Sequence, residues 1–568
     1  MSNKSKLFDL WASLYPGDNQ QRLEQFLEAL ISQSLDGESF QADWYKDAVV
    51  YSLYVDLFSN DFKSLTEKLD YLKGLGVSCL WLLPILDSPM RDAGFDIRNY
   101  DQIRPELLGL EENSSVAERE EVFGKFLAEA HNHGIRVIFD VAINHCSEEH
   151  PWFVEAKKSE DNPYRDYFIW SRDKSLYRDA RIIFKGMETS NWEPFGDSNF
   201  FHRFFNFQPD LNYKNPEVLL AMCRNLLYWQ SLGVDGFRAD AIPYLWKEEG
   251  TDCENLPQTH SVVKFFRAIL DYVKPGTLLL AEACQVPETV VKYMGDDDEC
   301  HAAYHFPLMP MFYKSIALHS SQPVRNILNP SVTPSLPENG QWFTFLRCHD
   351  ELSLELVYVT EEDRKYIHES YCHEPEWNFR LGEGISARLA NLFQFDDRRI
   401  GLAYSMMLSL PGTPVIYYGD EFGKENDVDY YKEMIKLVGK DDTRFLVRGK
   451  INWDKRELQL ADKETFQAKV FSRIQKMLFA RNKWKVFGRG SITFLNLGDL
   501  SNVHNDSILA YYRKYEHENI LVIQNLSDES QEVILPSNMN SSFELINEKK
   551  IPSGILRLEP YAYFWLRE

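Results

Sequence analysis

The sequence has few cysteines, and their spacing matches neither a disulfide framework nor a metal site. The eight cysteines are scattered over 568 residues, and none belongs to a CxxC pair. This spacing excludes a disulfide framework and the usual cysteine-based zinc sites. Several of the cysteines lie in apolar runs, so we expect buried thiols in a reducing compartment and therefore a cytoplasmic protein.

Long hydrophobic runs and an excess of positive charge are also missing. No stretch has the apolar length that spans a bilayer, and the first residues lack the apolar centre of a signal peptide. The formal net charge is −24, which disfavours nucleic acid and anionic membrane surfaces as partners because both would repel the chain. We therefore expect a small neutral ligand, and the sequence leaves open whether the chain forms a homo-oligomer.

Strands and helices alternate through most of the chain. Continuous apolar strands that follow amphipathic helices indicate a parallel sheet buried on both faces. The strands expected from this pattern are residues 48–58, 77–85, 135–143, 234–242, 277–283, 341–350 and 412–421. So many repeats favour an α/β fold with a closed (β/α)8 TIM barrel over an open sheet.

The remaining segments complete the expected domain organisation. The divisions are an N-terminal helical extension (1–43), a catalytic barrel (44–486) with an inserted subdomain B (145–212) and a lid-like insertion (351–394), and a C-terminal antiparallel β-sandwich (487–568). In the extension, apolar residues follow helical spacing through 6–33, and the polar stretch 34–39 ends the helical pattern. The insertions are assigned where the alternation fails over lengths too great for a barrel loop.

The stretch GVDGFRADAIPYL, residues 233–245, has two charged residues inside an apolar strand. Arg238 and Asp240 lie two residues apart and therefore share one face of the strand. Burying charges costs free energy unless they are paired, so we expect both residues to have a functional role. In a parallel barrel, active sites lie at the carboxyl ends of the strands, so we expect these residues at the active site.

Other expected strands deliver polar side chains to the same rim. They end in Asn144 and His145, in Glu282, in His349 and Asp350, and in Asp420 and Glu421. A single strand-end carboxylate usually caps a helix or pairs with an arginine, and we interpret Asp420 and Glu421 in that structural way. The convergence of Asp240, Glu282 and Asp350 fits either a divalent metal site or glycoside hydrolysis and transfer.

Arg238 favours the second of these chemistries. A guanidinium aimed at the site would repel a metal ion, whereas it would hold Asp240 ionised as a nucleophile. Glu282 follows an apolar run, a setting that favours the protonated form which a proton donor needs. Asp240 and Glu282 lie on consecutive expected strands, and neighbouring strand ends match the ~5–5.5 Å between the carboxyl groups of retaining enzymes.

Four segments together resemble the signature regions of the α-amylase superfamily, glycoside hydrolase family 13. They are DVAINH (140–145), GFRAD (236–240), LAEA (280–283) and FLRCHD (345–350), in the family's order. The resemblance implies a retaining α-glucoside-active enzyme with a covalent β-glucosyl-aspartate intermediate. It implies Asp240 as the nucleophile, Glu282 as the acid/base and Asp350 as the residue that orients the sugar hydroxyls.

The same resemblance implies a group of substrate-binding residues around one glucosyl unit. They are Asp92, Phe95, His145, Arg238, His349 and Arg448. Asp92 lies in MRDAGFD, which resembles a family segment of the form D-x-G-Y, with Phe95 in place of the tyrosine. Arg448 lies in TRFLVRGKINW, where the family has an RTPMQW-like motif. The resemblance implies that Arg448 pairs with Asp92 and closes the pocket behind one glucose, which favours disaccharides or chain ends.

Within the family, three regions resemble the trehalose synthases, which rearrange maltose to trehalose. They are residues 242–260, 279–310 and 345–357, and the insertion 351–394 resembles the lid of these enzymes. This implies intramolecular glucosyl transfer on maltose or a short maltooligosaccharide. One alternative is a retaining α-glucosidase that hydrolyses the same substrates with the same catalytic residues. The other is a non-catalytic carbohydrate-binding or chaperone-like relative, which the three retained carboxylates disfavour.

The calcium site of the family is altered in this sequence. The usual DGxGD-like loop is replaced by DLFSNDFKSL, and Asn144 and Asp210 resemble the remaining ligands. Lys247 stands where calcium-binding trehalose synthases carry an acid and oligo-1,6-glucosidases carry a lysine. We expect Lys247 to form a salt bridge with Asp210 in place of the ion, so no metal or cofactor is expected. The alternatives are a bound calcium ion and a solvated Lys247 on a helix.

Overall fold

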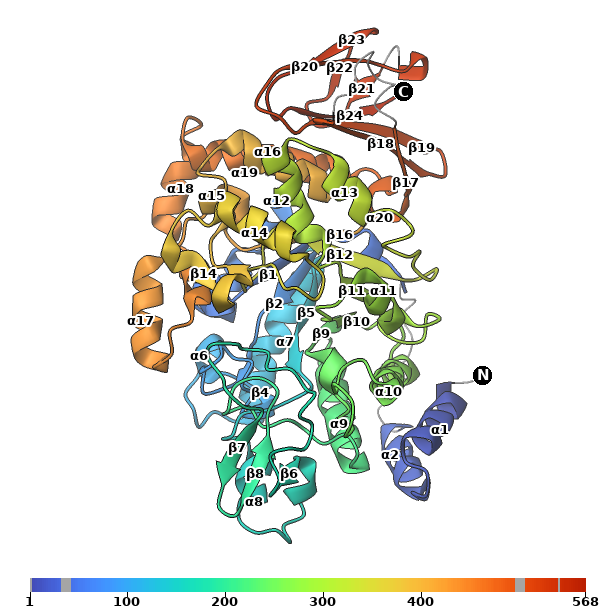
Figure 1. Cartoon of the computed structure of the whole chain (residues 1–568), viewed down its shortest axis with the longest axis vertical. Helices are drawn as coiled ribbons and strands as arrows, with labels where there is room; N and C mark the ends of the chain where they lie inside the picture. The colour runs from blue at the N-terminus through green and yellow to red at the C-terminus, as the bar shows by residue number, and fades with distance from the viewer. Residues whose placement is uncertain (1–2, 32–41, 496–505, 540–541) are drawn as a thin grey trace.

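Eight parallel strands close into a barrel at the centre of the molecule (Figure 1). The computed structural model describes residues 3–31, 42–495, 506–539 and 542–568. In their order around the barrel, the strands are β1 (Val50–Leu53), β16 (Thr413–Tyr417), β12 (Gln341–Phe345), β11 (Ala302–Tyr304), β10 (Leu278–Ala281), β9 (Gly236–Asp240), β5 (Arg136–Ala142) and β2 (Cys79–Leu82). The predicted TIM barrel is confirmed.

The register of β9 and β10 places the two expected catalytic carboxylates side by side. Gly236 pairs with Leu278, and a Cβ on Gly236 would lie 2.6 Å from the Cβ of Leu278, so only glycine allows this close approach. Three residues further along, Ala239 pairs with Ala281. Each of these alanines is followed by a residue with a carboxylate, Asp240 and Glu282, at the carboxyl end of the barrel.

One barrel strand, β11, was not expected from the sequence. It has only three residues, pairs with β10 and β12, and follows a run of acidic residues that reads as a loop. Ala302, Ala303 and Tyr304 are all buried, yet three residues are too few to show a periodic pattern. Barrel closure, rather than local sequence, determines this strand.

Amphipathic helices surround the barrel and cover the outer face of its strands. They are α4 (Phe62–Glu67), α5 (Leu69–Leu75), α7 (Val116–Asn132), α9 (Pro216–Ser231), α10 (Pro257–Val273), α12 (Leu308–Leu318), α16 (Asp397–Ser409) and α19 (Phe466–Asn482). Several begin with a side-chain cap. In α7, Ser115 and Glu118 form a reciprocal capping box that satisfies two backbone donors of the first turn.

Two insertions extend the carboxyl end of the barrel. Subdomain B follows β5 and contains α8 (Pro151–Ala156) with a small sheet of β6 (Trp170–Ser171), β8 (Ser198–Phe201) and β7 (Trp192–Phe195). The lid insertion follows β12 and contains α14 (Glu361–Tyr371) with a small sheet of β13 (Leu352–Ser353), β15 (Gly384–Ile385) and β14 (Asn378–Phe379). Both occur where the strand-helix alternation of the sequence fails.

The N-terminal extension forms two helices, α1 (Asn3–Leu14) and α2 (Gln21–Ile31). Trp11 of α1 is fully buried, and its ring lies 6.0 Å from that of Phe265 on α10. The Tyr15 hydroxyl donates to the carbonyl of Tyr213, just before α9. The extension is therefore packed against the barrel helices. The polar stretch 34–39, expected to end the helical pattern, lies outside the described residues.

The C-terminal segment is the predicted antiparallel β-sandwich, at the far end of the molecule from subdomain B (Figure 1). The larger sheet contains β17 (Ser491–Phe494), β18 (Ile508–Tyr515), β19 (Glu518–Asn525), β24 (Tyr563–Arg567), β21 (Phe543–Glu544) and β22 (Lys549–Lys550). The smaller sheet contains β20 (Gln531–Ile534) and β23 (Ile555–Leu558). Apolar side chains from both sheets, including Leu521 and Val533, form one cluster between them.

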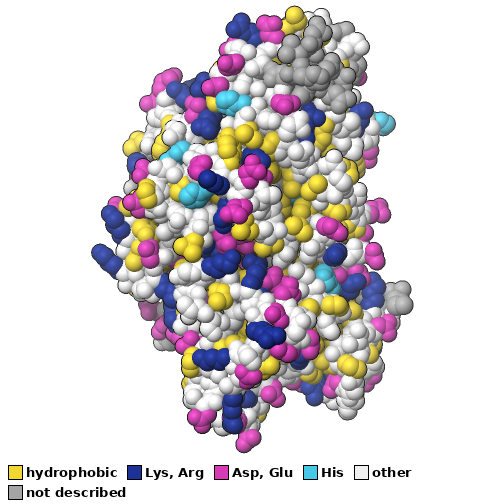
Figure 2. All heavy atoms as spheres, viewed as in Figure 1, with side chains coloured by type: hydrophobic (Ala, Val, Ile, Leu, Met, Phe, Trp, Pro, Cys, Tyr) yellow, Lys and Arg dark blue, Asp and Glu magenta, His cyan; other side chains and the backbone are white. Residues whose placement is uncertain are grey.

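The distribution of surface charge and the state of the cysteines are consistent with the composition of the sequence. Acidic and basic side chains are intermingled over the face shown in Figure 2, so the negative charge on that face is spread out. All eight cysteines are free thiols, and six of them are buried. Within the described ranges, the chain has no helix long and apolar enough to cross a membrane.

Candidate active site

A cavity opens at the carboxyl ends of the barrel strands, between the two insertions. The cavity and its mouth enclose about 1070 Å³. The predicted residues that line it are Asp92, Phe95, His145, Arg238, Asp240, Glu282, His349 and Asp350. The predicted residues outside the lining are Arg448 and the expected metal-site group Asn144, Asp210 and Lys247. Strands far apart in the sequence thus bring most of the predicted site into one cavity.

Arg238 lies between the two expected catalytic carboxylates. Its guanidinium donates to both Asp240 and Glu282, and a third contact joins its Nη1 to the Oδ1 of Asp140 at 2.8 Å. Arg238 is 1% exposed, so these ion pairs are poorly screened by water. The charged pair in the buried strand is therefore part of a cluster of one arginine and three carboxylates.

The ionisation of Asp240 differs from the sequence prediction. We expected Arg238 to hold Asp240 ionised, but the pKa of Asp240 is raised well above its ordinary value. Burial is the main cause, and the charge of Glu282 adds to it, while Arg238 only partly opposes both. Two buried carboxylates that share one guanidinium resist ionising together, and the proton they share belongs to the pair.

Asp350 has the opposite environment. Burial by itself would raise its pKa, but His349, whose Nε2 lies 3.0 Å from Oδ2, and the guanidinium groups of Arg444 and Arg448 hold it well below the ordinary value. Arg444 and Arg448 both contact Oδ1, at 3.0 and 3.1 Å. Asp350 is therefore a fixed negative charge and hydrogen-bond acceptor at the cavity wall.

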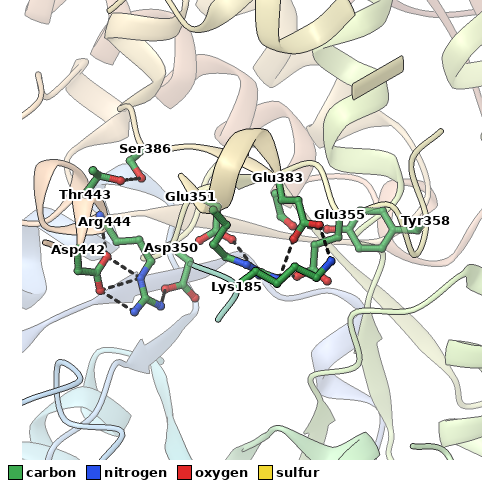
Figure 3. A network of polar contacts seen from close by, with 12 residues as sticks. Lys185, Asp350, Glu351, Glu355, Tyr358, Glu383, Ser386, Asp442, Thr443 and Arg444 are labelled. Carbon is green, nitrogen blue, oxygen red and sulfur yellow. Dashed lines mark hydrogen bonds and ion pairs between the residues drawn. The ribbon is translucent and has the colours of Figure 1, made fainter. Parts of the chain in front are cut away.

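The arginine that closes the pocket is Arg444, which corrects the prediction for Arg448. The Nη2 of Arg444 lies 3.2 Å from the Oδ1 of Asp92, and the same side chain is held by Asp442 (Figure 3). Arg448 instead lies behind the cavity, where it donates to the backbone carbonyl of His349 and to Asp350. The two arginines are four residues apart in a rewritten motif, and only their packing decides which one reaches Asp92.

Two histidines present unpartnered nitrogen atoms in the cavity wall. The Nε2 of His145 and the Nδ1 of His349 are buried and have no hydrogen-bond partner among the described residues. Burial lowers the pKa of His145, which keeps its ring neutral. Phe95 stacks on His349 with ring centroids 5.3 Å apart. Such unpaired polar atoms beside apolar rings suit a ligand that carries hydroxyl groups.

The ion pair predicted for Lys247 is present. Its Nζ lies 2.7 Å from the Oδ2 of Asp210 and 2.8 Å from the Oδ1 of Asn144. Lys247 is 3% exposed, so it is not a solvated surface lysine. Burial lowers its pKa, and Asp210 opposes that shift. Asp210 is also bridged to His145 through the backbone, so this contact supports the cavity wall from behind.

Only one group of potential metal ligands occurs in the part of the chain that the structure describes. It consists of Cys348, His349 and Asp350. Burial raises the pKa of the Cys348 thiol to about 12, so the sulfur is protonated. Asp350 already faces two guanidinium groups, which would repel a cation. This group therefore does not fit a metal site.

Sequence reasoning missed several cavity residues. Asp140, which contacts Arg238 from outside the cavity lining, was given no role in the site, although it is a charged residue within an apolar run, the same signal that identified Arg238. Glu351 and Glu355 line the cavity just after Asp350, and Arg181 and Arg380 line it from the two insertions. The pKa of Glu351 is raised to about 7, first by burial and then by the charge of Asp350.

Asp420 and Glu421, which we interpreted as structural, lie outside the cavity lining. Asp420 pairs with Arg388 at 3.1 Å, and Glu421 accepts hydrogen bonds from the hydroxyl groups of Tyr51 and Tyr71, each at 2.8 Å. Both carboxylates are buried with protein partners. A carboxylate at the end of a barrel strand is therefore not sufficient to identify a catalytic residue.

Comparison with protein families gives two matches along the chain. The catalytic domain of the alpha amylase family matches residues 36–370, and the alpha-amylase SusG C-terminal domain matches residues 508–562. The first match contains the cavity carboxylates Asp240, Glu282 and Asp350, and the second lies within the β-sandwich.

Curated proteins named trehalose synthase are similar over much of the chain. The trehalose synthase/amylase of Mycolicibacterium smegmatis is 47% identical over 394 residues, which is 67% of this chain and 64% of that protein. The trehalose synthase of Thermus thermophilus is 40% identical over 87% of this chain and 51% of that protein. The chain thus spans about half to two thirds of these two relatives. The trehalose synthase of Pimelobacter is 36% identical over 93% of this chain and 96% of that protein.

Solved structures share the whole architecture at lower sequence identity. The alpha-amylase of H. orenii superposes with a TM-score of 0.69 at 23% identity, covering 92% of this chain and 99% of that one. The isomaltulose synthase of Klebsiella superposes with a TM-score of 0.66 at 23% identity, with the same coverage. At this identity the likeness describes the fold alone.

Proposed function

The chain belongs to the α-amylase family, and from that premise we propose that it converts maltose to trehalose by moving one glucosyl unit within a closed site. The observation that carries the proposal is the single buried guanidinium of Arg238, shared by the carboxylates of Asp240 and Glu282. Carboxylates on neighbouring strands suit a retaining mechanism. The name of the Pimelobacter relative, which is matched along nearly its whole length, supports the same reaction.

The first step forms a covalent intermediate. Asp240 attacks the anomeric carbon of the non-reducing glucose of maltose, while Glu282 donates its proton to the glycosidic oxygen. The glycosidic bond breaks, a β-glucosyl ester forms on Asp240, and a free glucose remains in the cavity. The positive charge that develops on the sugar ring favours the ionised form of Asp240, which offsets the effect of burial on its pKa.

The second step reverses the first with a different hydroxyl group. The free glucose turns so that its anomeric hydroxyl faces the ester, and Glu282 accepts the proton of that hydroxyl. The oxygen attacks the glucosyl carbon, the ester bond to Asp240 breaks, and an α,α-linked disaccharide forms. Asp240 and Glu282 then have their initial protonation states, so the cycle is balanced without a further reactant.

The closed end of the cavity supports a disaccharide substrate. Arg444 joins Asp92 to Asp350 and so blocks the cavity behind one glucosyl unit. The lid insertion and subdomain B also cover the cavity, through Arg380 and Arg181. A site covered by two insertions excludes water from the ester, which favours transfer over hydrolysis.

The contact between Lys247 and Asp210 favours the second candidate, a retaining α-glucosidase. In the family that lysine resembles the one in oligo-1,6-glucosidases, and the oligo-1,6-glucosidase of Bacillus cereus is 25% identical over 92% of this chain. The two candidates share every catalytic residue. They differ in whether glucose or water attacks the ester, which is a question of water exclusion.

Incubation with maltose distinguishes the two candidates. We expect trehalose as the main product, with glucose as a minor one, when the sugars are separated by chromatography over the time course. Glucose as the only product would replace the proposal by the α-glucosidase. Unchanged maltose would contradict both candidates.

Arg444 is expected to hold the substrate and not only the fold. In the variant Arg444→Gln, Asp92 and Asp350 each lose a charged hydrogen-bond partner at the sugar pocket. Charged hydrogen bonds contribute ~1.5–3 kcal/mol, so we expect KM for maltose to rise by about 10-fold or more. Arg398→Gln, which removes an exposed ion pair with Asp396, is the control and should leave KM unchanged. Equal KM values for both variants would contradict the role of Arg444.

Calcium does not fit the position that the family uses for it. The oxygen atoms of Asp210 and Asn144, which would be ligands, are already bound by the ammonium group of Lys247. Calcium takes six to eight oxygen ligands at about 2.3–2.6 Å, and a buried ammonium at this position would repel it. The proposal is therefore a metal-free enzyme in which Lys247 replaces the ion. The eight free thiols support a reducing, cytoplasmic setting.

A further inference from the structure

A second groove lies in subdomain B, next to the catalytic cavity. With its open mouth it encloses about 650 Å³, which is within the range of small-molecule sites. Arg181 lines both the groove and the catalytic cavity, and no other described residue is common to the two linings. The groove is therefore a separate space from the one in which maltose would react.

Side-chain hydrogen bonds and an aromatic pair hold the walls of this groove. The indole Nε1 of Trp192 donates to the carbonyl of Leu176 at 2.9 Å. The Nδ2 of Asn191 donates to the carbonyl of Ala180, also at 2.9 Å. The ring of Tyr177 lies parallel to that of Trp192, with 5° between the planes and 6.1 Å between the centroids. The walls are thus fixed, and the Tyr177 ring is only partly buried.

Tyr177 also begins a tight turn with a strained backbone. Its φ is 55°, in the left-handed region that a large side chain rarely adopts, and its backbone N–H donates to the Oε2 of Glu249 at 2.6 Å. The N–H of Ala180 donates to the carbonyl of Tyr177 at 3.0 Å, which closes the turn around Arg178 and Asp179. Strain of this kind is often found where a protein holds a ligand. The turn places Arg178 in the groove lining.

The charge of the groove differs from that of the chain as a whole. Three cationic side chains line it, and no acidic side chain is among the described residues of the lining. Arg181 already has carboxylate partners, Glu254 at 2.8 Å and Glu355 at 3.4 Å. Lys174 and Arg178 are exposed, and neither side chain has an ion pair or hydrogen bond with another described residue. In a chain of net charge −24, two such cations in one groove favour an anionic ligand.

We propose that this groove binds a sugar phosphate, with the phosphate group between Lys174 and Arg178 and the sugar ring against Tyr177. A phosphate monoester carries about two negative charges and three acceptor oxygens, which suits two cations on long side chains. The apolar face of a sugar ring suits the partly exposed ring of Tyr177. Neither Lys174 nor Arg178 lines the catalytic cavity, so this ligand is not the substrate of the catalytic carboxylates.

Titration calorimetry with glucose 6-phosphate tests the proposal while saturating 1-deoxynojirimycin, a glucose mimic, fills the catalytic cavity. We expect glucose 6-phosphate to bind under these conditions. Lys174→Gln and Arg178→Gln should each raise its Kd about three- to ten-fold, between the effects of an exposed ion pair and of a charged hydrogen bond. Arg172→Gln changes the net charge equally but removes an exposed pair with Glu160 outside the groove, so this control should leave Kd unchanged. All three variants should keep the parent kcat and KM for maltose.

Two further ligands separate the phosphate contact from the sugar contact. Inorganic phosphate and glucose should each bind more weakly than glucose 6-phosphate, because each makes only one of the two contacts. Equal affinity for inorganic phosphate would show a plain anion site, and equal affinity for glucose a neutral sugar site, and either result would overturn the proposal. It is also overturned if glucose 6-phosphate does not bind beside 1-deoxynojirimycin, or if the groove variants raise Kd no more than Arg172→Gln does.

Discussion

Asp240→Asn should reduce maltose turnover by about 10,000-fold or more and leave the folded protein at least as stable as the parent. An amide does not form the glucosyl ester, so the covalent route is lost, and removal of a nucleophile typically has an effect of this size. The thermal midpoint should not fall, because burial and the charge of Glu282 disfavour the ionised Asp240 in the folded state. Sugar chromatography measures the first effect and calorimetry the second.

Asp420→Asn is the matched control for that prediction. Asp420 also follows a barrel strand, but it pairs with the buried Arg388 outside the cavity. Its loss leaves an unpaired buried charge, so we expect a lower thermal midpoint and an unchanged kcat for the folded fraction. Normal turnover in Asp240→Asn, or the same loss of kcat in both variants, would remove Asp240 from the mechanism.

Lys247→Met should lower the free energy of unfolding by about 3–5 kcal/mol. Methionine keeps the length of the side chain but leaves Asp210 as a buried carboxylate without its cation, and breaking one partner of a buried ion pair costs this much. Denaturant unfolding measures the change. Lys214→Met, which removes a more exposed pair with Glu248 nearby, should cost less than about 1 kcal/mol. Equal costs for the two variants would contradict the structural role of Lys247.

Treatment with a chelator distinguishes a site that Lys247 fills from a site that binds a metal ion. If Lys247 replaces calcium, a chelator should leave the thermal midpoint of the parent enzyme unchanged, and added calcium should not raise it. A lower midpoint in the chelator, restored by calcium, would show that Asp210 and Asn144 bind the ion. In that case the contact of Lys247 with these residues would not exclude calcium.

Much of the site could be predicted because its charged residues lie in or next to apolar strands. Arg238 and Asp240 are charged residues in an apolar strand, and Asp350 follows another apolar strand, so contact with solvent does not explain their charges. The pairing of Lys247 with Asp210 was also predictable, since both stand at positions of a familiar metal site. By the same reasoning Asp140 was detectable, because it too is a charge within a buried strand.

Other features of the fold and the site could be identified only from the tertiary structure. The choice between Arg444 and Arg448 as the partner of Asp92 depends on how one turn packs, and the sequence resemblance indicated Arg448 instead. The strand β11 is too short to have a pattern of its own and forms because the barrel closes there. The raised pKa of Asp240 depends first on its burial and then on the nearby charge of Glu282, and both are set by the packing of the barrel.

By itself, the sequence determined the barrel, its insertions and the convergence of Asp240, Glu282 and Asp350 at one end of the barrel. These follow from periodicity and from single residues whose burial has to be compensated, and both are local properties of the chain. Only the tertiary structure decided which arginine closes the pocket and that burial and the charge of Glu282 raise the pKa of Asp240. These depend on distances between segments far apart in the chain, and ion pairs and pKa values change steeply over a few ångströms.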